Sequence, residues 1–326
     1  MKEIKRRSFL SGMAGVGAGM VTGCANLPFV GQSTKEIPKR TLGRTKVEVP
    51  ILGLGTACIG NARIGKEKAV PLIHEAIDLG VTYLDTARVY NDAEMYLGEV
   101  LPTRRDEVFL VEKVMTDNYK EAEKSFEDSL RTLKVDHVDL LHMHNVGGFE
   151  TDKVMGPGGT MEFVLKMKEQ GKARFVGVTG HTRADRFLPV IETDQFDALM
   201  VTLNFVDKHT YNFEDRILPL ARKHNMGIVA MKVFGGREQE NFKGFSKYKT
   251  PGPSNLPSDA LEDAFRYSLS LEGVSCSVIG LYNQKELRQN VALAKTFQPL
   301  SEEEKKRMDT LGQDQAAVWR EHYGAV

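Results

Sequence analysis

The chain alternates between two kinds of segment, and this alternation constrains its fold more than any other feature. Eight short runs of β-branched and apolar residues follow one another, separated by stretches with helical spacing. In one such stretch, Ala122, Phe126, Leu130 and Leu133 fall on one helical face. The runs cover residues 51–57, 82–87, 108–114, 139–145, 175–181, 198–204, 227–233 and 276–281. This pattern is typical of βα units that right-handed crossovers join into a parallel sheet.

The number of units favours a closed barrel over an open sheet. Such barrels commonly span about 250 residues as one domain, which fits a chain of 326 residues. The rival fold, a doubly wound sheet with a second domain, would need a Gly-x-Gly-x-x-Gly loop after its first strand. Gly53-Leu54-Gly55-Thr56 lacks the third glycine. We therefore predict an α/β fold, a (β/α)8 TIM barrel.

Two further elements are expected outside the repeated units. Residues 40–49 are typical of a hairpin that covers the barrel floor, with Gly43 in its turn. Ser301 and Glu304 have the spacing of a capping box, which predicts the start of a last helix carrying Trp319.

The first 34 residues differ from the rest of the chain. A basic start with Arg6 and Arg7 precedes a weakly apolar stretch, 8–34, that carries no charge. This is typical of an export signal, and Arg6-Arg7-Ser8-Phe9-Leu10 resembles the twin-arginine type, which exports folded proteins. Val21-Thr22-Gly23-Cys24 resembles a lipoprotein box with Cys24 acylated; an uncleaved anchor or cleavage near Ala25 without lipid stays open.

We therefore expect a signal and linker over 1–34 and a barrel domain over 35–326. The protein would be periplasmic or anchored to the membrane through Cys24, with the twin-arginine machinery as a partner. The charge balance, 44 Lys+Arg against 44 Asp+Glu, gives no support to a nucleic-acid partner. The three cysteines form no CxxC pair, which speaks against zinc-ribbon and iron–sulfur sites. Cys58 and Cys276 are expected at different levels of the barrel, too far apart for a disulfide.

Polar side chains stand where three neighbouring runs end, the place where barrel enzymes carry their chemistry. Asp85 ends the second run, and Tyr90 lies in the loop that follows. Lys113 ends the third run and His144 the fourth. Each alone has a plain structural interpretation, such as a turn cap, a surface ring, a salt bridge or a core histidine. Four together are harder to explain in this way, because buried charge without partners is costly.

The chemistry that this set supports is proton donation. A tyrosine with a pKa near its ordinary value of about 10 is a poor acid at neutral pH. A lysine cation beside it favours the phenolate, and a carboxylate keeps the lysine charged and in place. An imidazole across the mouth could orient a carbonyl oxygen. A site that protonates oxygen while a hydride reaches carbon needs a cofactor for the hydride.

With these residues in place, the chain resembles the aldo-keto reductase superfamily from about residue 40 to 298. The segment 85–90 (DTARVY), followed by Glu94 and Leu97-Gly98, is similar to the family's Asp…Tyr segment and the helix after it. Residues 129–144 resemble its helix-to-fourth-strand signature, and 171–178 resemble the entry to strand five. The resemblance implies NAD(P)H-dependent reduction of an aldehyde or ketone, or the reverse oxidation.

Residue by residue, the resemblance gives each member of the set a role. Tyr90 is the general acid/base, Lys113 its pKa partner, Asp85 the anchor of the lysine and His144 the imidazole that orients the carbonyl. The cofactor-binding residues carried over in the same way are Gly55, Thr56, Asp85, Thr179, His181, Met200, Met231, Lys232, Phe234, Asn283 and Asn290.

The cofactor side departs from the family pattern. Thr179-Gly180-His181 stands where Ser-Asn is usual, Met200 where a Gln commonly holds the carboxamide, and Met231 where an aromatic ring stacks on the nicotinamide. Core filling explains the methionines equally well, although a polarisable thioether could also stack. Glu286 replaces an arginine that some members use for the 2′-phosphate, although Lys285 and Arg288 flank it. On family grounds, NADP(H) is favoured over NAD(H), with no metal.

Two other functions stay open. His142 and His144 lie two apart on one strand and both face the interior. With His181 and Asp85 they could hold zinc in a barrel hydrolase, although Lys113 would repel a dication. A nucleotide-binding sensor subunit without activity is the second alternative.

The loops at 146–160 and 235–257 are expected to shape specificity. The second could act as a lid that slows cofactor release. The substrate would be a small-molecule carbonyl or alcohol. Because nicotinamide cofactors are not freely supplied outside the cytoplasm, an exported enzyme would bind its cofactor before translocation.

Overall fold

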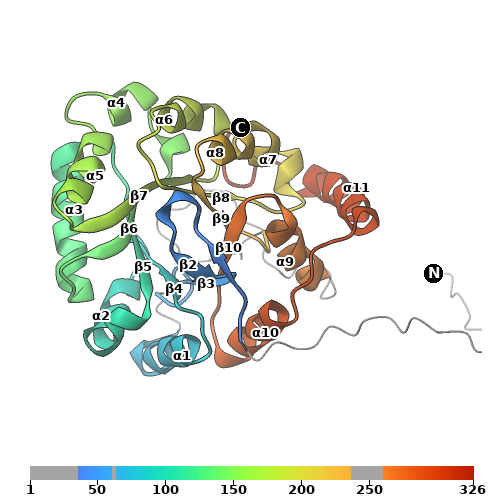
Figure 1. Cartoon of the computed structure of the whole chain (residues 1–326), viewed down its shortest axis with the longest axis horizontal. Helices are drawn as coiled ribbons and strands as arrows, with labels where there is room; N and C mark the ends of the chain where they lie inside the picture. Colours follow the sequence, from blue (N-terminus) through green and yellow to red (C-terminus); the bar gives the residue numbers. More distant parts are fainter. Residues whose placement is uncertain (1–35, 61–63, 236–259) are drawn as a thin grey trace, which may run out of the picture. The chain divides into compact units, whose positions relative to one another are not determined.

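The computed structural model of the protein describes residues 36–60, 64–235 and 260–326. Eight parallel strands close into a barrel in the order β10-β3-β4-β5-β6-β7-β8-β9 (Figure 1). The strands are β3 (Leu52–Gly55), β4 (Tyr83–Asp85), β5 (Phe109–Val114), β6 (Val138–Met143), β7 (Ala173–Gly180), β8 (Ala198–Thr202), β9 (Gly227–Met231) and β10 (Val274–Gly280). Each overlaps one of the eight predicted runs, so the predicted TIM barrel is confirmed.

Helices surround the barrel and follow the strands in the chain (Figure 1). They are α1 (Lys66–Asp78), α2 (Ala93–Arg104), α3 (Tyr119–Leu133), α4 (Thr151–Met155), α5 (Thr160–Glu169), α6 (Leu188–Glu192), α7 (Phe213–Arg216), α8 (Leu218–Lys223), α9 (Ala260–Ser270), α10 (Gln284–Lys295) and α11 (Glu302–Trp319). Short 3-10 turns lie at η1 (Gly43–Thr45), η2 (Arg105–Glu107), η3 (Val146–Gly148), η4 (Ala184–Phe187) and η5 (Asp207–His209). The capping box of Ser301 and Glu304 opens α11 as predicted.

The predicted hairpin is present as β1 (Lys39–Thr41) and β2 (Glu48–Pro50), which pair antiparallel. Its connection is longer than a tight turn and contains η1. Gly43 has a φ of +47°, and a Cβ there would lie 2.3 Å from the backbone nitrogen of Gly227 at the start of β9. Leu42 is fully buried in the cluster that fills the barrel. The hairpin therefore closes the floor, and glycine is needed where it meets β9.

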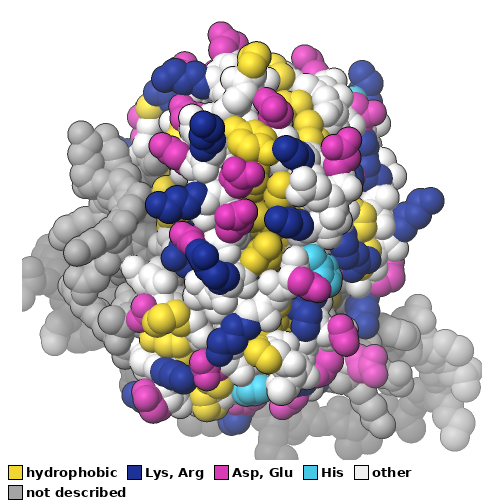
Figure 2. Space-filling view, turned by 90° about the vertical axis from the view of Figure 1, so that its left-hand side faces the viewer, with side chains coloured by type: hydrophobic (Ala, Val, Ile, Leu, Met, Phe, Trp, Pro, Cys, Tyr) yellow, Lys and Arg dark blue, Asp and Glu magenta, His cyan; other side chains and the backbone are white. Residues whose placement is uncertain are grey.

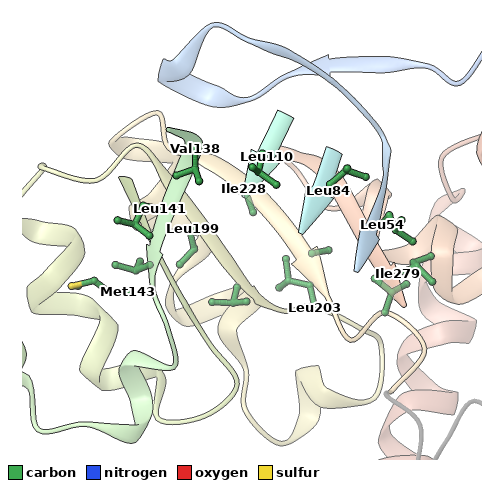
Figure 3. Close-up of a cluster of buried hydrophobic side chains, with 14 of the residues drawn as sticks. Leu54, Leu84, Leu110, Val138, Leu141, Met143, Leu199, Leu203, Ile228 and Ile279 are labelled. Carbon is green, nitrogen blue, oxygen red and sulfur yellow. The ribbon is translucent and has the colours of Figure 1, made fainter. Parts of the chain in front are cut away.

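The core has two layers, because successive strand residues point to opposite sides. Outward-facing residues such as Leu54, Leu84, Leu110 and Leu141 belong to the cluster between strands and helices (Figure 3). The inner layer fills the barrel itself. Its buried members are Leu42, Val49, Tyr83, Phe109, Val111, Leu140, Ala198, Met200, Val229, Met231, Cys276 and Val278. Apolar side chains therefore pack the barrel interior below the polar groups at its mouth.

The surface carries charge of both signs. On the face drawn in Figure 2, Lys and Arg side chains are interspersed with Asp and Glu. Within the described ranges, no helix is both long enough and apolar enough to cross a membrane. The predicted export signal over 1–34, the lipidation site Cys24 and almost all of the predicted lid at 235–257 lie outside the described residues.

Candidate active site

Three neighbouring strands bring the predicted catalytic residues together at one mouth of the barrel. Asp85 is the last residue of β4, and Lys113 is the penultimate residue of β5. His144, which the sequence predicts to end the fourth strand, directly follows β6, whose last residue is Met143. Tyr90 lies in the loop between β4 and α2, whose first helical residue is Ala93 as expected. Since β4, β5 and β6 are adjacent in the barrel, their carboxyl ends share one edge.

A buried ion pair forms the centre of this group. The Lys113 Nζ lies 2.6 Å from Asp85 Oδ1, and both side chains are almost fully buried. The same ammonium donates to the carbonyl oxygen of Thr86 at 2.7 Å. It also lies 4.8 Å from the centre of the Tyr90 ring. That ring is perpendicular to the His144 imidazole, at a centroid distance of 6.0 Å. All four predicted side chains are thus neighbours in space.

Burial and charge oppose each other at Tyr90. Burial raises the pKa of Tyr90 to about 12, although the Lys113 ammonium acts to lower it. The sequence led us to expect that the lysine would govern this pKa; its effect has the expected sign, but loss of hydration is larger. Burial also opposes the charge of Lys113, yet Asp85 and Tyr90 outweigh it, and the pKa of Lys113 is raised. At neutral pH, Tyr90 is a protonated phenol beside a charged lysine.

The histidines at the mouth are neutral. Burial, followed by the charge of Lys113, holds the pKa of His144 well below its ordinary range. Burial and Lys113 also lower the pKa of His142 to about 3. Burial, then Lys232 and Lys113, hold the pKa of His181 well below its ordinary range. A neutral imidazole can accept a hydrogen bond at one nitrogen and donate from the other, so His144 can orient a polar substrate atom without bringing charge.

The next strands in the barrel carry the residues predicted for the nicotinamide. Thr179 is buried near the end of β7, and its hydroxyl lies 3.9 Å from the sulfur of Met231. His181 follows that strand directly. Met200 and Met231 both belong to the packed cluster inside the barrel. Both methionines thus contribute to the packing of the barrel interior, and Thr179 and His181 carry polar side chains at and just beyond the end of β7.

Lys232 follows β9 in a backbone conformation that is rare for a side-chain-bearing residue, with a φ of +58°. Asn204 stabilises it by donating from Nδ2 to the carbonyl of Lys232 at 3.0 Å and to Oδ2 of Asp207 at 2.6 Å. Burial lowers the pKa of Lys232. A partly desolvated ammonium gains from an anionic partner, so this position suits a phosphate group.

Two predicted residues at the end of β3 serve to connect strands. The backbone N–H and the hydroxyl of Thr56 both donate to the carbonyl of Asp85, at 2.9 Å and 3.0 Å. Gly55 packs against β10, where a Cβ would lie 3.1 Å from a methyl group of Val278. These contacts fix the strand that ends in the buried carboxylate.

The residues predicted for the adenosine end lie at and within α10. Asn283 caps the helix by accepting from the N–H of Glu286, and the Glu286 carboxylate accepts from the N–H of Tyr282 at 2.8 Å. Asn290 is buried on the same helix. Arg288 pairs with Glu75 of α1, its Nε 2.6 Å from Oε1. Arg288, one of the two basic residues that flank Glu286 in the sequence, therefore directs its positive charge toward α1.

The structure also brings in residues that the sequence did not single out. Glu112, next to Lys113, is fully buried and accepts a hydrogen bond from the loop that carries Tyr90. The C-terminal tail reaches the mouth as well. The ring of Tyr323 lies 5.5 Å from that of His181 and 5.7 Å from the Lys232 ammonium. No local sequence signal marks Tyr323, because about 90 residues separate it from Lys232; a charged residue inside an apolar strand was a usable signal for Glu112.

The zinc alternative lacks its ligand set. In the part of the chain that the structure describes, no group of three or more His, Cys, Asp or Glu side chains could hold a metal ion. Among the described cysteines, Cys58 and Cys276 are both free thiols, as predicted.

Phe234, which was also predicted to contact the cofactor, is half-buried and lies in the chain just after β9.

Comparison with known proteins places this site in a family. The family model described as "Aldo/keto reductase family" matches residues 51–313. The chain therefore belongs to the aldo/keto reductase family, as the sequence motifs suggested, and this membership indicates an oxidoreductase acting on small-molecule carbonyl or alcohol substrates. L-galactose dehydrogenase of Arabidopsis thaliana is 25% identical over 296 residues, which cover 81% of this chain and 90% of that protein.

Solved structures share the fold. The holo form of an aldo-keto reductase from Bacillus halodurans is 24% identical and matches with a TM-score of 0.69, covering 89% of this chain and 100% of that chain. An aldo/keto reductase from Klebsiella pneumoniae, solved with NADP and acetate, is 22% identical and has a TM-score of 0.63, with 85% and 95% of the two chains covered.

Proposed function

We propose that this protein interconverts a carbonyl and an alcohol with a nicotinamide cofactor, and that Tyr90 transfers the proton. The observation that carries the proposal is the buried cluster at the ends of β4, β5 and β6. There the Lys113 ammonium lies 2.6 Å from Asp85 and 4.8 Å from the Tyr90 ring centre. The cofactor, when bound, supplies or accepts the hydride.

Side chains of the protein then transfer the proton, stabilise the phenolate and orient the carbonyl. Tyr90 keeps its proton at neutral pH and can donate it to a developing alkoxide. Lys113 stabilises the phenolate that is left, and Asp85 holds Lys113 in place and charged. His144 is neutral and can orient the carbonyl oxygen through a hydrogen bond.

The residues at the ends of β7 and β9 and on α10 support the proposal that the cofactor is a nicotinamide dinucleotide. We propose that Thr179 and His181 contact the carboxamide, that Lys232 contacts a phosphate, and that α10 with Asn283 and Asn290 holds the adenosine end. We propose NADP(H) over NAD(H) on family grounds, and the reductase of Klebsiella pneumoniae was solved with NADP. The pairing of Arg288 with Glu75 and the position of Glu286 leave Lys285 as the basic candidate for a 2′-phosphate.

The test is a fluorescence titration of the protein with NADPH and NADH separately, followed by carbonyl-dependent oxidation of the bound cofactor. Tyr90→Phe should retain nucleotide binding and lose turnover. Tyr96→Phe is the matched control, because Tyr96 lies on α2 with its hydroxyl 3.3 Å from Asp92. Full turnover in Tyr90→Phe would exclude Tyr90 as the acid. Binding without turnover for any carbonyl or alcohol would favour the sensor alternative.

We also propose that residues 1–34 direct export through the twin-arginine pathway, with the domain 35–326 folded and loaded with cofactor beforehand, and that Cys24 carries the lipid. Arg6 and Arg7 support the pathway, and the sequence Val21-Thr22-Gly23-Cys24 supports lipidation. Lysine at both arginine positions should retain the protein in the cytoplasm, and Cys24→Ala should abolish palmitate labelling. Periplasmic or membrane protein recovered without nucleotide would contradict loading before export.

A further inference from the structure

Glu112 is an acidic residue in the middle of a buried strand, next to Lys113. Because neighbouring strand residues point to opposite sides, Lys113 faces the barrel mouth while Glu112 faces the layer of helices. Its side chain is fully buried. We propose that Glu112 is a positioning residue that holds the Tyr90 loop at the distance that proton transfer requires. The proposal rests on the function proposed above.

The side chains of Glu112 and Lys113 form hydrogen bonds with the same loop from its two sides. Oε1 of Glu112 accepts the backbone N–H of Arg88 at 3.1 Å, and also the N–H of Lys113 at 2.9 Å. From the other side, the Lys113 ammonium donates to the carbonyl of Thr86 at 2.7 Å. Arg88 is two residues from Tyr90 in sequence. The path of the loop from Thr86 to Tyr90 is therefore set by one pair of adjacent residues on β5.

The side chain of Arg88 fixes the loop further. Its Nη1 lies 2.5 Å from Oε2 of Glu94 on α2 and 3.0 Å from the hydroxyl of Thr132 on α3. These helices approach closely at Gly98, where a Cβ would lie 2.2 Å from the carbonyl oxygen of Thr132. The loop that carries Tyr90 is thus tied to β5 through its backbone and to α2 and α3 through a side chain.

The charge of Glu112 is compatible with this role. The groups around it are the cations Lys113 and Arg88 and the acids Glu94 and Asp85. Burial, and then the charge of Glu94, raise the pKa of Glu112 well above its ordinary range. A protonated carboxyl still accepts through its carbonyl oxygen. A protonated Glu112 adds no negative charge beside Tyr90, whereas a charged Glu112 acts to raise the pKa of Tyr90.

The proposal differs from a purely structural role in what it predicts for turnover. If Glu112 only stabilised the fold, its replacement would lower stability and leave the turnover of the folded enzyme unchanged. If it positions Tyr90, loss of the acceptor lowers kcat while the nucleotide, which binds on other strands, keeps its affinity. The split between kcat and nucleotide affinity therefore separates the two roles.

The test compares Glu112→Gln with Glu112→Met. Both substitutes are close to glutamate in size, but only glutamine keeps an oxygen that accepts the two N–H groups. We expect Glu112→Gln to retain wild-type kcat and Glu112→Met to lose about 10- to 100-fold, the scale of loss that a displacement of about 1 Å causes. The dissociation constant for NADPH should not change in either variant.

Ser301→Ala, which removes the capping box of α11 away from the site, serves as the control for destabilisation and should keep wild-type kcat. If Glu112→Met does not fold, Glu112→Asp keeps the acid, shortens its reach by one methylene and should also lower kcat. Wild-type kcat in folded Glu112→Met, or in Glu112→Asp where that variant replaces it, overturns the proposal. Absence of turnover in the wild-type protein, or full turnover in Tyr90→Phe, would instead overturn the proposed function itself.

Discussion

Replacing Lys113 by methionine removes the ammonium from the buried ion pair and nearly preserves side-chain volume. In the wild-type protein, Nζ lies 2.6 Å from Asp85 Oδ1 and 2.7 Å from the carbonyl of Thr86, so both oxygens lose this donor. Removing one partner of a buried pair costs about 3–5 kcal/mol, because the other charge stays buried without compensation. We expect the free energy of unfolding, measured in urea at pH 7, to fall by about that amount.

The double variant Asp85→Asn, Lys113→Met separates the cost of an isolated charge from the value of the pair. With both charges gone, most of the lost stability should return, because replacing a buried pair as a whole is often neutral. Turnover should not return, since both residues support Tyr90 in the proposed function. A loss below about 1 kcal/mol in Lys113→Met, the value typical of exposed pairs, would refute this account of the site.

The same pair predicts a dependence on pH. Burial acts to lower the pKa of Lys113, but Asp85 and Tyr90 outweigh it and the pKa is raised on folding. A group with a raised folded pKa contributes its full stabilisation below its unfolded pKa, about 10.4 for lysine, and loses it as pH rises through the folded value. The stability difference between wild type and Lys113→Met should therefore shrink above about pH 10. A difference that stays flat to pH 12 would contradict this.

Three further substitutions test the frame around the site. Ser301→Ala removes the capping box of α11 and should lower stability by about 1 kcal/mol, seen as a lower thermal midpoint. His322→Ala removes the buried partner of Asp207, whose Oδ1 lies 2.6 Å from Nε2, and should cost about 1–3 kcal/mol; an unchanged midpoint would show that the tail is not fixed there. Gly98→Ala places a methyl group 2.2 Å from the Thr132 carbonyl and should destabilise by about 1–3 kcal/mol despite alanine's better helix propensity, so a more stable variant would contradict the close contact of α2 and α3.

The barrel could be predicted from the sequence because its signal is local and repeated. Each βα unit shows an apolar run followed by helical spacing, and eight repeats leave little choice of topology. The positions of Asp85, Lys113 and His144 follow from the same signal, since strand ends in a parallel barrel meet at one edge. The shift of His144 to one residue beyond β6 is within the usual error of strand boundaries.

The chemistry of Tyr90 could be predicted only in part. Sequence places a lysine near the tyrosine and gives the sign of its effect on the pKa, but it does not give the degree of burial. Burial turns the net shift upward, to about 12. Met200 and Met231 show the same limit, because a residue aligned with a cofactor contact and a residue filling the core look alike until the packing is known.

Contacts between segments that are distant in the chain could not be predicted from the sequence. Arg288 and Glu75 are 213 positions apart in the sequence. Because Arg288 pairs with Glu75, its positive charge is directed toward α1 and not toward Glu286. Tyr323 reaches Lys232 and His181 only because α11 brings the tail back to the mouth. Neither contact leaves a spacing that a sequence pattern could detect.

Glu112 and Lys113 show that residues on both faces of one barrel strand can hold the same loop. The outward face of such a strand normally packs against helices, so an acid there would be read as a defect or a misplaced surface residue. In β5 it forms two backbone hydrogen bonds and meets the loop that Lys113 holds from the inner side. Because the two residues are adjacent on β5, a shift of the loop away from this strand would lengthen the hydrogen bonds that Glu112 and Lys113 form with it. A polar residue on the outer face can therefore hold the loop that carries Tyr90 as directly as one on the inner face.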